Sequence, residues 1–455
     1  MSAIREIRLG LSLDRLSKRP TSTRRSHNVK DISYTNDRTM EPTTVTFDRR
    51  QVYRPFLASL SLSSPNALGD LIVAPEHDPR EPDQPPIHVA FANAAELTRG
   101  VQMALVGGIG SGKTTELWLT SKVLKRHQDA INLLIDLAEI TDLNQLNPGA
   151  VLIAIGMQLY RKIKKPRSEE VTLVFKKLRE LAHGTTKWVA PDEFDSTVDF
   201  EPDVDFDDEP ELVPVHTPGL LKPRFPAIHR EVADVLDLVR EIAAPLLGSD
   251  AQITVIIDGL DRLIQPERFR QFAEQDLRAL RATQISLIVA APLLLWFDKS
   301  RFLQDYFDEV KHLPAAISDP DESDFLNQIL LRRGAADLMD QQEISDISRF
   351  SGGVLRDLIT LARTSVETAY REDKDRIDAS HVRSAVRQLG RRYLVGLGKT
   401  HRARIRRLME NEEFLLENPV SKELLVNRQV LEYFSNGRDF FAVHPALKEV
   451  LQESS

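Results

Sequence analysis

Cysteine is absent from the 455 residues of this chain. Disulfides, thiolate zinc sites, iron–sulfur clusters and a cysteine nucleophile are therefore excluded. The longest nearly unbroken apolar run, residues 285–297, has 13 residues and is too short for a membrane-spanning helix. The best apolar run near the N-terminus, residues 9–13, is too short for the core of a signal peptide. We therefore expect a cytoplasmic protein with no membrane contact.

Charges of one sign are missing from two segments. Residues 192–211 hold eleven Asp and Glu side chains and no Lys or Arg, whereas residues 379–409 hold nine Lys and Arg side chains and no Asp or Glu. Residues 1–39 are also basic, with nine basic and four acidic side chains. The formal net charge of −8 is therefore a sum over segments of opposite sign and says little about partners.

The first 50 residues are polar, basic and rich in Ser, Thr and Arg. This composition predicts a disordered tail, with one short helix at residues 4–16. The stretch from Met40 is also compatible with the N-terminus of the natural protein. Both Met1 and Met40 stay open as the first residue of the natural protein.

Short apolar strands alternate with helices in the next part of the chain. Strands are expected at residues 101–106, 131–138, 253–257, 285–290 and 310–314. Helices are expected at residues 88–97, 113–127, 152–163, 228–247 and 266–282. Nearly continuous apolar strands between helices predict a parallel sheet covered on both faces. We assign residues 51–318 to this α/β core, with an acidic insert at residues 164–225.

The C-terminal part has a different pattern. Helical apolar spacing predicts a helical lid over residues 319–395, with helices at residues 322–333, 342–350, 354–370 and 379–389. Residues 396–455 are expected to form a small α/β region. It combines a helix at residues 421–426, two strands joined by the turn signal Asn436-Gly437, and a final helix from Pro445. This order is that of a winged helix.

A glycine-rich loop carries the strongest functional signal. Residues 107–114 read Gly-Gly-Ile-Gly-Ser-Gly-Lys-Thr and fit the pattern G-x-x-x-x-G-K-[ST] between an expected strand and an expected helix. Glycines let consecutive backbone N–H groups converge on phosphate oxygens, and the helix N-terminus adds positive partial charge. We expect Lys113 to bridge the β- and γ-phosphates of ATP and Thr114 to bind Mg²⁺. The nucleotide-binding set is Gly107, Gly108, Ile109, Gly110, Ser111, Gly112, Lys113, Thr114 and Thr115.

A second acidic motif follows the apolar strand at residues 253–257, where the chain reads Asp258-Gly259-Leu260-Asp261. An Asp at the tip of a strand beside a phosphate loop can hold Mg²⁺. Thr114 and Asp258 are therefore the expected metal-binding residues.

These motifs, together with the helical C-terminal part, resemble the AAA+/STAND branch of P-loop ATPases. The overall organisation is similar to that of origin-recognition-type AAA+ ATPases, over about residues 90–389 without the insert. The resemblance implies a P-loop NTPase parallel sheet with a helical AAA+ lid, and hydrolysis of ATP to ADP and phosphate. It also implies catalytic roles for Lys113, Asp258, Asp261 and Arg356.

Two of these roles rest on positions in the family pattern. In STAND-like proteins the second acid comes three positions after the first, which makes Asp261 the candidate for polarising the attacking water. A pairing of Asp261 with Arg262 or with a neighbouring loop stays open. Arg356 lies in Ser-Gly-Gly-Val-Leu-Arg-Asp-Leu, residues 351–358, which resembles the lid motif whose arginine reaches the γ-phosphate.

The sequence also departs from the family pattern. Gly259 stands where typical AAA+ proteins carry the glutamate that activates water. The strand expected at residues 285–290 lacks a polar sensor residue near its end, because residues 287–292 are all apolar. Arg301 is the candidate for an arginine finger that acts between subunits. The sequence therefore leaves open whether the protein hydrolyses ATP efficiently.

Three functions are compatible with these features. The first is a nucleotide-controlled switch or assembly ATPase, with a protein partner or effector and a homo-oligomeric state; the resemblance implies bacterial stress or phage-defence signalling. The second is a DNA-associated ATPase of the origin-recognition or transposition-helper type, with nucleic acid bound through residues 379–409. The third is a nucleotide-binding adaptor without hydrolysis. The acidic residues 192–211 could also dock on the basic residues 379–409 and inhibit the protein.

Overall fold

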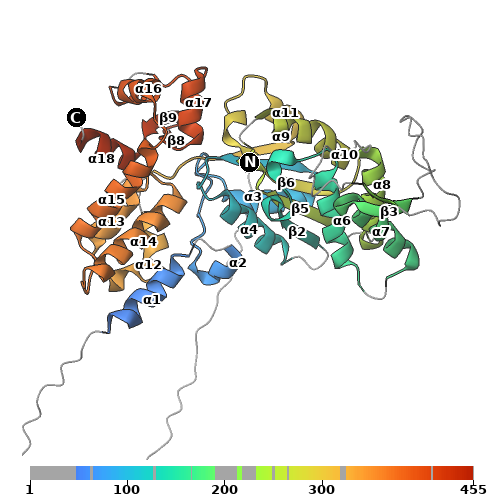
Figure 1. Cartoon of the computed structure of the whole chain (residues 1–455), viewed down its shortest axis with the longest axis horizontal. Coiled ribbons are helices and arrows are strands. Elements are labelled where there is room, and N and C mark those ends of the chain that lie inside the picture. The colour runs from blue at the N-terminus through green and yellow to red at the C-terminus, as the bar shows by residue number, and fades with distance from the viewer. Residues whose placement is uncertain are drawn as a thin grey trace, which may run out of the picture. The chain divides into compact units, whose positions relative to one another are not determined.

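The computed structural model describes residues 48–61, 65–126, 130–164, 167–189, 213–217, 232–247, 252–263, 266–317, 324–410 and 413–453. The tail helix expected at residues 4–16 and the acidic residues 192–211 lie outside this part of the chain. Figure 1 shows the chain coloured from its N-terminus to its C-terminus, with the elements labelled. No helix in the described part is both long enough and apolar enough to cross a membrane.

The described part of the core contains a sheet of five parallel strands in the order β2-β5-β6-β1-β7. The strands are β1 Gln102–Gly107, β2 Ala130–Asp136, β5 Gln252–Asp258, β6 Ser286–Pro292 and β7 Glu309–Leu313. The three central strands are buried almost throughout. This burial explains their continuous apolar sequences, and the predicted parallel α/β fold is confirmed.

Helices cover both faces of this sheet (Figure 1). Val255 and Ile257 of β5 pack into one apolar cluster, and Ile256 packs into the other, as the two-residue period of a strand requires. One cluster contains the helices α6 Ala150–Lys162, α7 Glu169–His183, α8 Val232–Ala243 and α9 Pro266–Phe272. The other contains α3 Ile87–Leu97 and α4 Lys113–Leu124. Shorter helices are α2 Pro65–Leu68, α5 Leu137–Ile140, α10 Arg278–Arg281 and α11 Phe302–Tyr306.

The helix expected at residues 266–282 contains a π-helical segment, Ala273–Leu277, between α9 and α10. Asp276 in this segment is buried and accepts hydrogen bonds from the backbone N–H groups of Gly149 (2.7 Å) and Val151 (3.1 Å). Its burial raises the pKa of Asp276 to about 6. The carboxyl group satisfies N–H groups at the start of α6, where the N-cap residue Gly149 has no side chain.

The insert contains an antiparallel strand pair that the sequence analysis did not predict. Strands β3 Thr185–Val189 and β4 Val213–Thr217 pair directly after α7. The acidic residues 192–211 fall between these two strands in the sequence. The strand pair places Val189 opposite Val213.

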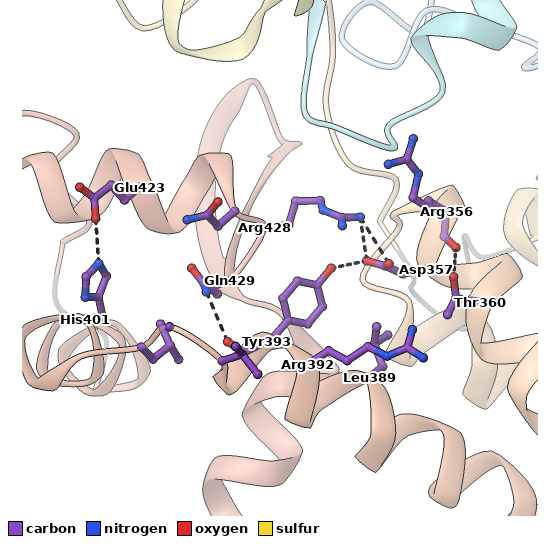
Figure 2. A pocket seen from close by; sticks show the side chains of 14 residues that line it. Arg356, Asp357, Thr360, Leu389, Arg392, Tyr393, His401, Glu423, Arg428 and Gln429 are labelled. Atoms are coloured by element: carbon purple, nitrogen blue, oxygen red, sulfur yellow. Dashed lines mark hydrogen bonds and ion pairs between the residues drawn. The ribbon is translucent and has the colours of Figure 1, made fainter. Parts of the chain in front are cut away.

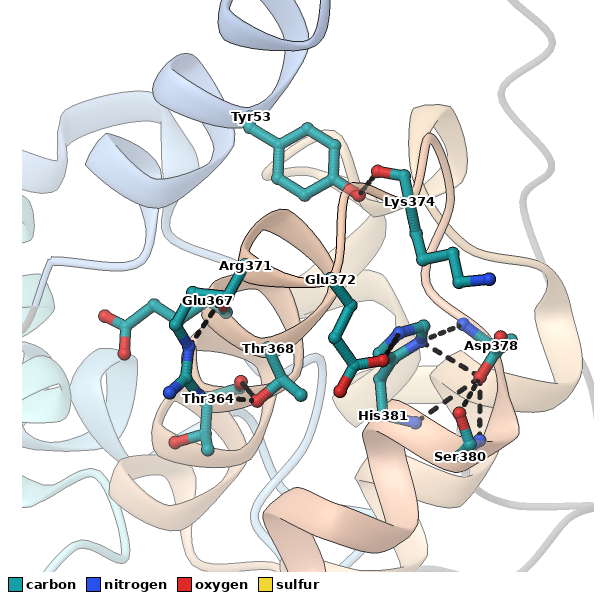
Figure 3. Close-up of polar contacts among 10 residues, drawn as sticks. All are labelled: Tyr53, Thr364, Glu367, Thr368, Arg371, Glu372, Lys374, Asp378, Ser380 and His381. Atoms are coloured by element: carbon teal, nitrogen blue, oxygen red, sulfur yellow. Dashed lines mark hydrogen bonds and ion pairs between the residues drawn. The ribbon is translucent and has the colours of Figure 1, made fainter.

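The lid is helical as predicted, with α12 Asp324–Leu331, α13 Gln341–Phe350, α14 Leu355–Arg371 and α15 Ala379–Leu394. A further helix, α1 Arg49–Ser59, packs on it although it lies more than 260 residues earlier in the sequence. Tyr53 and Phe56 of α1 are buried in the lid's apolar cluster, and the Tyr53 hydroxyl donates to the carbonyl of Lys374 at 3.0 Å (Figure 3). The segment before the sheet thus contributes to the lid.

A capping box starts α15. The Asp378 carboxylate accepts from the backbone N–H groups of Ser380 and His381, and the His381 ring accepts from the backbone N–H of Asp378 (Figure 3). His381 is buried, with its Nε2 atom 3.3 Å from the Glu372 carboxylate. The polar cap therefore also fixes the turn between α14 and α15.

The C-terminal region contains α16 Lys399–Met409, α17 Pro419–Val426, β8 Val430–Ser435, β9 Arg438–Val443 and α18 Pro445–Glu453. Strands β8 and β9 form an antiparallel hairpin, with positive φ at Asn436 (51°) and Gly437 (75°). The predicted hairpin and its Asn-Gly turn are confirmed. Helix α18 packs tightly on α15, because a Cβ atom on Gly390 would lie 2.2 Å from the carbonyl oxygen of Ala446.

Candidate functional site

The glycine-rich loop lies where the sequence places it, between the end of β1 at Gly107 and the start of α4 at Lys113. Gly110 and Gly112 have φ values of 86° and 110°, which favour glycine. The buried Lys113 amine donates to the carbonyl groups of Gly107 and Gly108, both at 2.8 Å. The lysine is therefore held within the loop.

The loop has features that suit a phosphate ligand. The Ser111 hydroxyl is buried and has no hydrogen-bond partner among the residues that the structure describes. Buried polar groups without partners are rare because they cost free energy. Together with the Lys113 ammonium group and the N-terminus of α4, this hydroxyl makes the loop suitable for an anion such as a nucleotide phosphate.

The two residues predicted to bind Mg²⁺ lie in contact. The Thr114 hydroxyl donates to Asp258 Oδ2 at 2.7 Å, and Asp258 stands at the C-terminal end of β5. Burial raises the pKa of the Asp258 carboxyl group, partly offset by the hydrogen bond from Thr114. A cation would favour the ionised form of this buried carboxyl group. The oxygen ligands and their position beside the phosphate loop fit Mg²⁺.

Asp261 pairs with the loop lysine. A 3₁₀ turn, Leu260–Arg262, follows Gly259, whose φ is 95°. The turn places Asp261 Oδ2 at 2.9 Å from Lys113 Nζ. Arg262 instead lies 3.8 Å from the carboxylate of Asp136. Of the partners left open by the sequence, the structure brings Asp261 to the phosphate loop, where a phosphate would compete with it for Lys113.

The lid rests on the phosphate loop. The backbone N–H of Leu355, the first residue of α14, donates to the carbonyl of Gly110 at 2.9 Å. A Cβ atom on Gly110 would lie 2.8 Å from Val354 Cγ1 and 3.3 Å from Arg356 Cβ. Arg356 is exposed, and its guanidinium group points away from Asp357 in Figure 2. The predicted lid arginine thus starts directly beside the loop.

A second arginine, which was not predicted from the sequence, also lies beside the loop. Arg428 belongs to the C-terminal region, and its Nη1 atom would lie 3.7 Å from a Cβ atom on Gly110. The same nitrogen is 3.3 Å from Asp357 Oδ1. No motif surrounds Arg428, so the sequence contains no signal for its position.

No protein-family model matches this sequence, and no curated protein matches it. Solved structures are similar to it. They include the Aeropyrum pernix Orc1 protein in complex with DNA, at 15% identity over 83% of this chain and 94% of that chain, with a TM-score of 0.42. Drosophila ORC bound to DNA has 11% identity over 92% and 96%, with a TM-score of 0.43. Cdc6p from Pyrobaculum aerophilum has 13% identity over 87% and 98%, with a TM-score of 0.41.

The five-stranded parallel sheet, the glycine-rich loop between β1 and α4, and the helical lid together form the P-loop architecture predicted from the sequence.

Strand β6 of the sheet ends without a polar side chain beside the phosphate loop. Strand β6 finishes with Ala290, Ala291 and Pro292 beside the phosphate-loop strand, where Pro292 pairs with Gly107. Its polar residue, Ser286, lies at the other end and accepts a hydrogen bond from the backbone N–H of Gly100. The end of β6 therefore offers no side-chain polar group to a γ-phosphate or an attacking water.

A polar cluster around the buried side chains of His312 and Glu432 joins the α/β core to the C-terminal hairpin. Arg80 donates to Asp439 on β9 at 2.5 Å and to His312 Nδ1 on β7 at 2.7 Å. His312 Nε2 faces the Glu432 carboxyl group on β8 at 3.2 Å. The backbone N–H of Ala315 donates to the carbonyl of Glu432 at 3.1 Å. The hairpin is thus attached to the edge strand next to the phosphate-loop strand.

This cluster predicts a pH dependence of stability. Burial raises the pKa of Glu432 to about 8 and lowers the pKa of His312 to about 3. Arg80 and Asp439 are the other charged groups that face Glu432. Between the ordinary pKa of a glutamate and pH 8, Glu432 is protonated in the folded protein and ionised in the unfolded chain. The folded state therefore binds more protons in this range, and the contribution of Glu432 to the free energy of unfolding falls as the pH rises to 8. Below the ordinary pKa of His312, near 6.5, His312 acts in the opposite direction.

Thermal unfolding between pH 7.5 and 8.5 isolates the glutamate, since at least about nine-tenths of His312 is neutral there in both states. The unfolding temperature of the unmodified protein is expected to fall more steeply across this range than that of Glu432→Gln, which keeps a neutral side chain of similar shape. Identical slopes for the two proteins would contradict the protonated state of Glu432. Glu241→Gln, at an exposed position on α8, is the matched control.

Proposed function

We propose that this protein is a nucleotide-controlled switch or assembly ATPase, in which ATP with Mg²⁺ binds between the core and the lid. The observation that carries this proposal is the hydrogen bond from Leu355 to Gly110. It places the first turn of a lid helix on the phosphate loop. A nucleotide that reorganises the loop would therefore shift the lid as well. A protein partner that reads the lid, a homo-oligomeric state and a role in stress or phage-defence signalling belong to this proposal.

Each site residue has a role in this proposal. The backbone of residues 107–115 and Lys113 would hold the phosphates, and Thr114 with Asp258 would hold Mg²⁺. Arg356 would reach the γ-phosphate from the lid. Asp261 would polarise the attacking water once a phosphate has taken its place on Lys113.

Slow hydrolysis is part of the same proposal. Asp261 is engaged by Lys113, and the end of β6 is apolar. A protein with these features would remain in its ATP-bound form for long periods, as suits a switch. Phosphate release measured alongside ATP binding separates a slow ATPase from an adaptor that binds without turnover.

The magnesium site can be tested with Asp258→Asn. We expect ATP affinity in the presence of Mg²⁺ to fall about tenfold or more, because the variant loses a charge-assisted contact worth about 1.5–3 kcal/mol. Affinity measured in EDTA should not fall, since the substitution removes only a negative charge near the phosphates. Titration of a fluorescent ATP analogue measures both. Asp237→Asn, an exposed position on α8, is the control, and an equal loss with and without Mg²⁺ would contradict the metal role.

A second candidate function is that of a DNA-associated ATPase, favoured by the exposed arginines of α15 and α16. These are Arg383, Arg387, Arg391, Arg392, Arg402, Arg406 and Arg407. Two of the similar structures contain DNA, as their descriptions state. Titration with duplex DNA at two salt concentrations tests this candidate. Affinity that falls steeply with salt would support it, and no binding at low salt would remove it.

A further inference from the structure

We propose that Arg428 senses the phosphates of the bound nucleotide and transmits its state to the C-terminal region. In this proposal Arg428 exchanges its partner, Asp357 of the lid, for a phosphate at the P-loop. The inference rests on the proposed nucleotide binding at that loop. It adds a residue from outside the core and the lid to the group that responds to ATP.

The position of Arg428 is the first argument. Its Nη1 atom lies 3.3 and 3.4 Å from the two Asp357 oxygens and would lie 3.7 Å from a Cβ atom on Gly110. One guanidinium nitrogen thus faces both a lid carboxylate and the phosphate loop. Figure 2 shows Arg428 reaching toward Asp357 from the side of the C-terminal region. A small shift of the guanidinium group would exchange one anionic partner for the other.

The backbone of Arg428 is the second argument. Its φ is 61°, in the left-handed region that few residues other than glycine adopt. The residue stands between α17 and β8, and its N–H donates to the carbonyl of Leu425 at 3.1 Å. Unfavourable backbone conformations persist where the surrounding structure or a function requires them. Here this conformation occurs at the residue whose side chain reaches the loop.

Asp357 keeps other partners when Arg428 leaves. The Tyr393 hydroxyl donates to Asp357 Oδ2 at 2.6 Å, and His444 Nε2 lies 3.3 Å from the same oxygen. His444 Nδ1 accepts from the backbone N–H of Ala446, so the proton of a neutral ring is on Nε2 and faces Asp357. Although burial raises it, the pKa of Asp357 is held below its usual value by His444, Arg428 and Tyr393. The carboxylate would therefore stay hydrogen-bonded without the arginine.

The Arg428 side chain borders a large cavity on the lid side and only a small hollow on the side of the phosphate loop. A cavity of 600 Å³, lined by Arg428, Asp357, Arg356, Arg392 and Tyr393 among others, opens on the lid side (Figure 2). Toward the loop, Arg428 borders a hollow of only 20 Å³ together with Gly108 and Ser111. That is close to the space of one water molecule. A phosphate that approaches from the loop therefore requires the Arg428 side chain or the lid to move.

A movement of Arg428 would be passed on to the hairpin. Strand β8 begins two residues after Arg428. Its Glu432 carbonyl accepts from the backbone N–H of Ala315 at the end of the core, and the Tyr433 hydroxyl donates to the lid carbonyl of Gly352 at 2.9 Å. The strand thus touches both the core and the lid. A displacement of the first residues of β8 would therefore alter both the contact with Ala315 and the contact with Gly352.

The test compares Arg428→Ala and Arg428→Lys with the unmodified full-length protein. Binding of ATP and ADP is measured by titration, and hydrogen exchange of residues 419–443 is measured with each nucleotide. For Arg428→Ala we expect the preference for ATP over ADP to fall about tenfold, the size of a lost charge-assisted contact. The ATP-dependent change in hydrogen exchange at β8 should disappear. Arg428→Lys, which keeps the charge, should restore part of both.

Arg438→Ala is the matched control, because Arg438 is an exposed arginine at the start of β9. It should behave as the unmodified protein does. If Arg428→Ala keeps the full ATP preference and the full exchange response, Arg428 only supports the structure and the inference is wrong. If the unmodified protein and Arg438→Ala both fail to bind ATP, the proposed function itself is wrong, and the role of Arg428 is rejected with it.

Discussion

Lys113→Ala is expected to lower the affinity for ATP by about 100-fold or more. The ammonium group is held at 2.8 Å from two loop carbonyls, where it would meet the phosphates. The loss of charge-assisted hydrogen bonds of about 3 kcal/mol corresponds to a change of this size. The variant also leaves the Asp261 carboxylate beside the loop without its cation, so the remaining charge there repels phosphate. Titration with a fluorescent ATP analogue measures the effect.

The double variant Lys113→Ala/Asp261→Asn separates these two contributions. It should bind ATP more tightly than Lys113→Ala alone, because the repelling carboxylate is gone. Lys122→Ala is the control, since Lys122 lies at the other end of α4 over the Trp118 ring. ATP binding undiminished in Lys113→Ala would contradict the assignment of the phosphate loop.

Gly353→Ala is expected to separate the lid from the core or to unfold it. A Cβ atom at this position would lie 1.8 Å from the carbonyl oxygen of Ala316 and 2.6 Å from its backbone nitrogen. A backbone cannot move aside as a flexible side chain does, so the segments must part. We expect the free energy of unfolding to fall by about 4 kcal/mol or more, at the upper end of the range for single substitutions. Chemical denaturation followed by circular dichroism measures it.

Gly396→Ala provides the matched control for the backbone conformation. Gly396 also has a positive φ, 83°, but a Cβ atom there would meet nothing within 4 Å. This variant should lose only the cost of the left-handed conformation, about 1–2 kcal/mol. Equal losses in the two variants would mean that the contact between Gly353 and Ala316 is looser than the structure has it.

The parts of this protein that are encoded locally were predictable from the sequence. The three central strands of the sheet are short apolar runs, because their residues are buried on both faces, and the glycine-rich loop is a contiguous motif. The turn at Asn436 and Gly437 and the cap at Asp378 also depend on neighbouring residues alone. In these places the physical cause lies within a few residues of its effect.

The remaining parts depend on contacts between distant segments. Helix α1 was not predicted, since its apolar side chains are explained only by a lid that begins more than 260 residues later. The partner of Asp261 could not be chosen between Arg262 and a neighbouring loop, because the 3₁₀ turn that aims it at Lys113 is not encoded by a motif. The contacts of Arg428 and of the cluster around His312 could not be predicted either, because each of them joins three segments that are far apart in the sequence.

The joint at Gly352 and Gly353 has a consequence for how this molecule can move. Space at Gly352 is taken by Leu431, Pro445 and Tyr433 of the C-terminal region, and space at Gly353 by the backbone at Ala316. Neither glycine leaves a gap that would absorb a gradual displacement. A packed joint of this kind has discrete arrangements and no continuous range between them. A rotation at this joint would therefore switch the lid between discrete arrangements. A ligand would change the population of each arrangement and not the angle of the rotation.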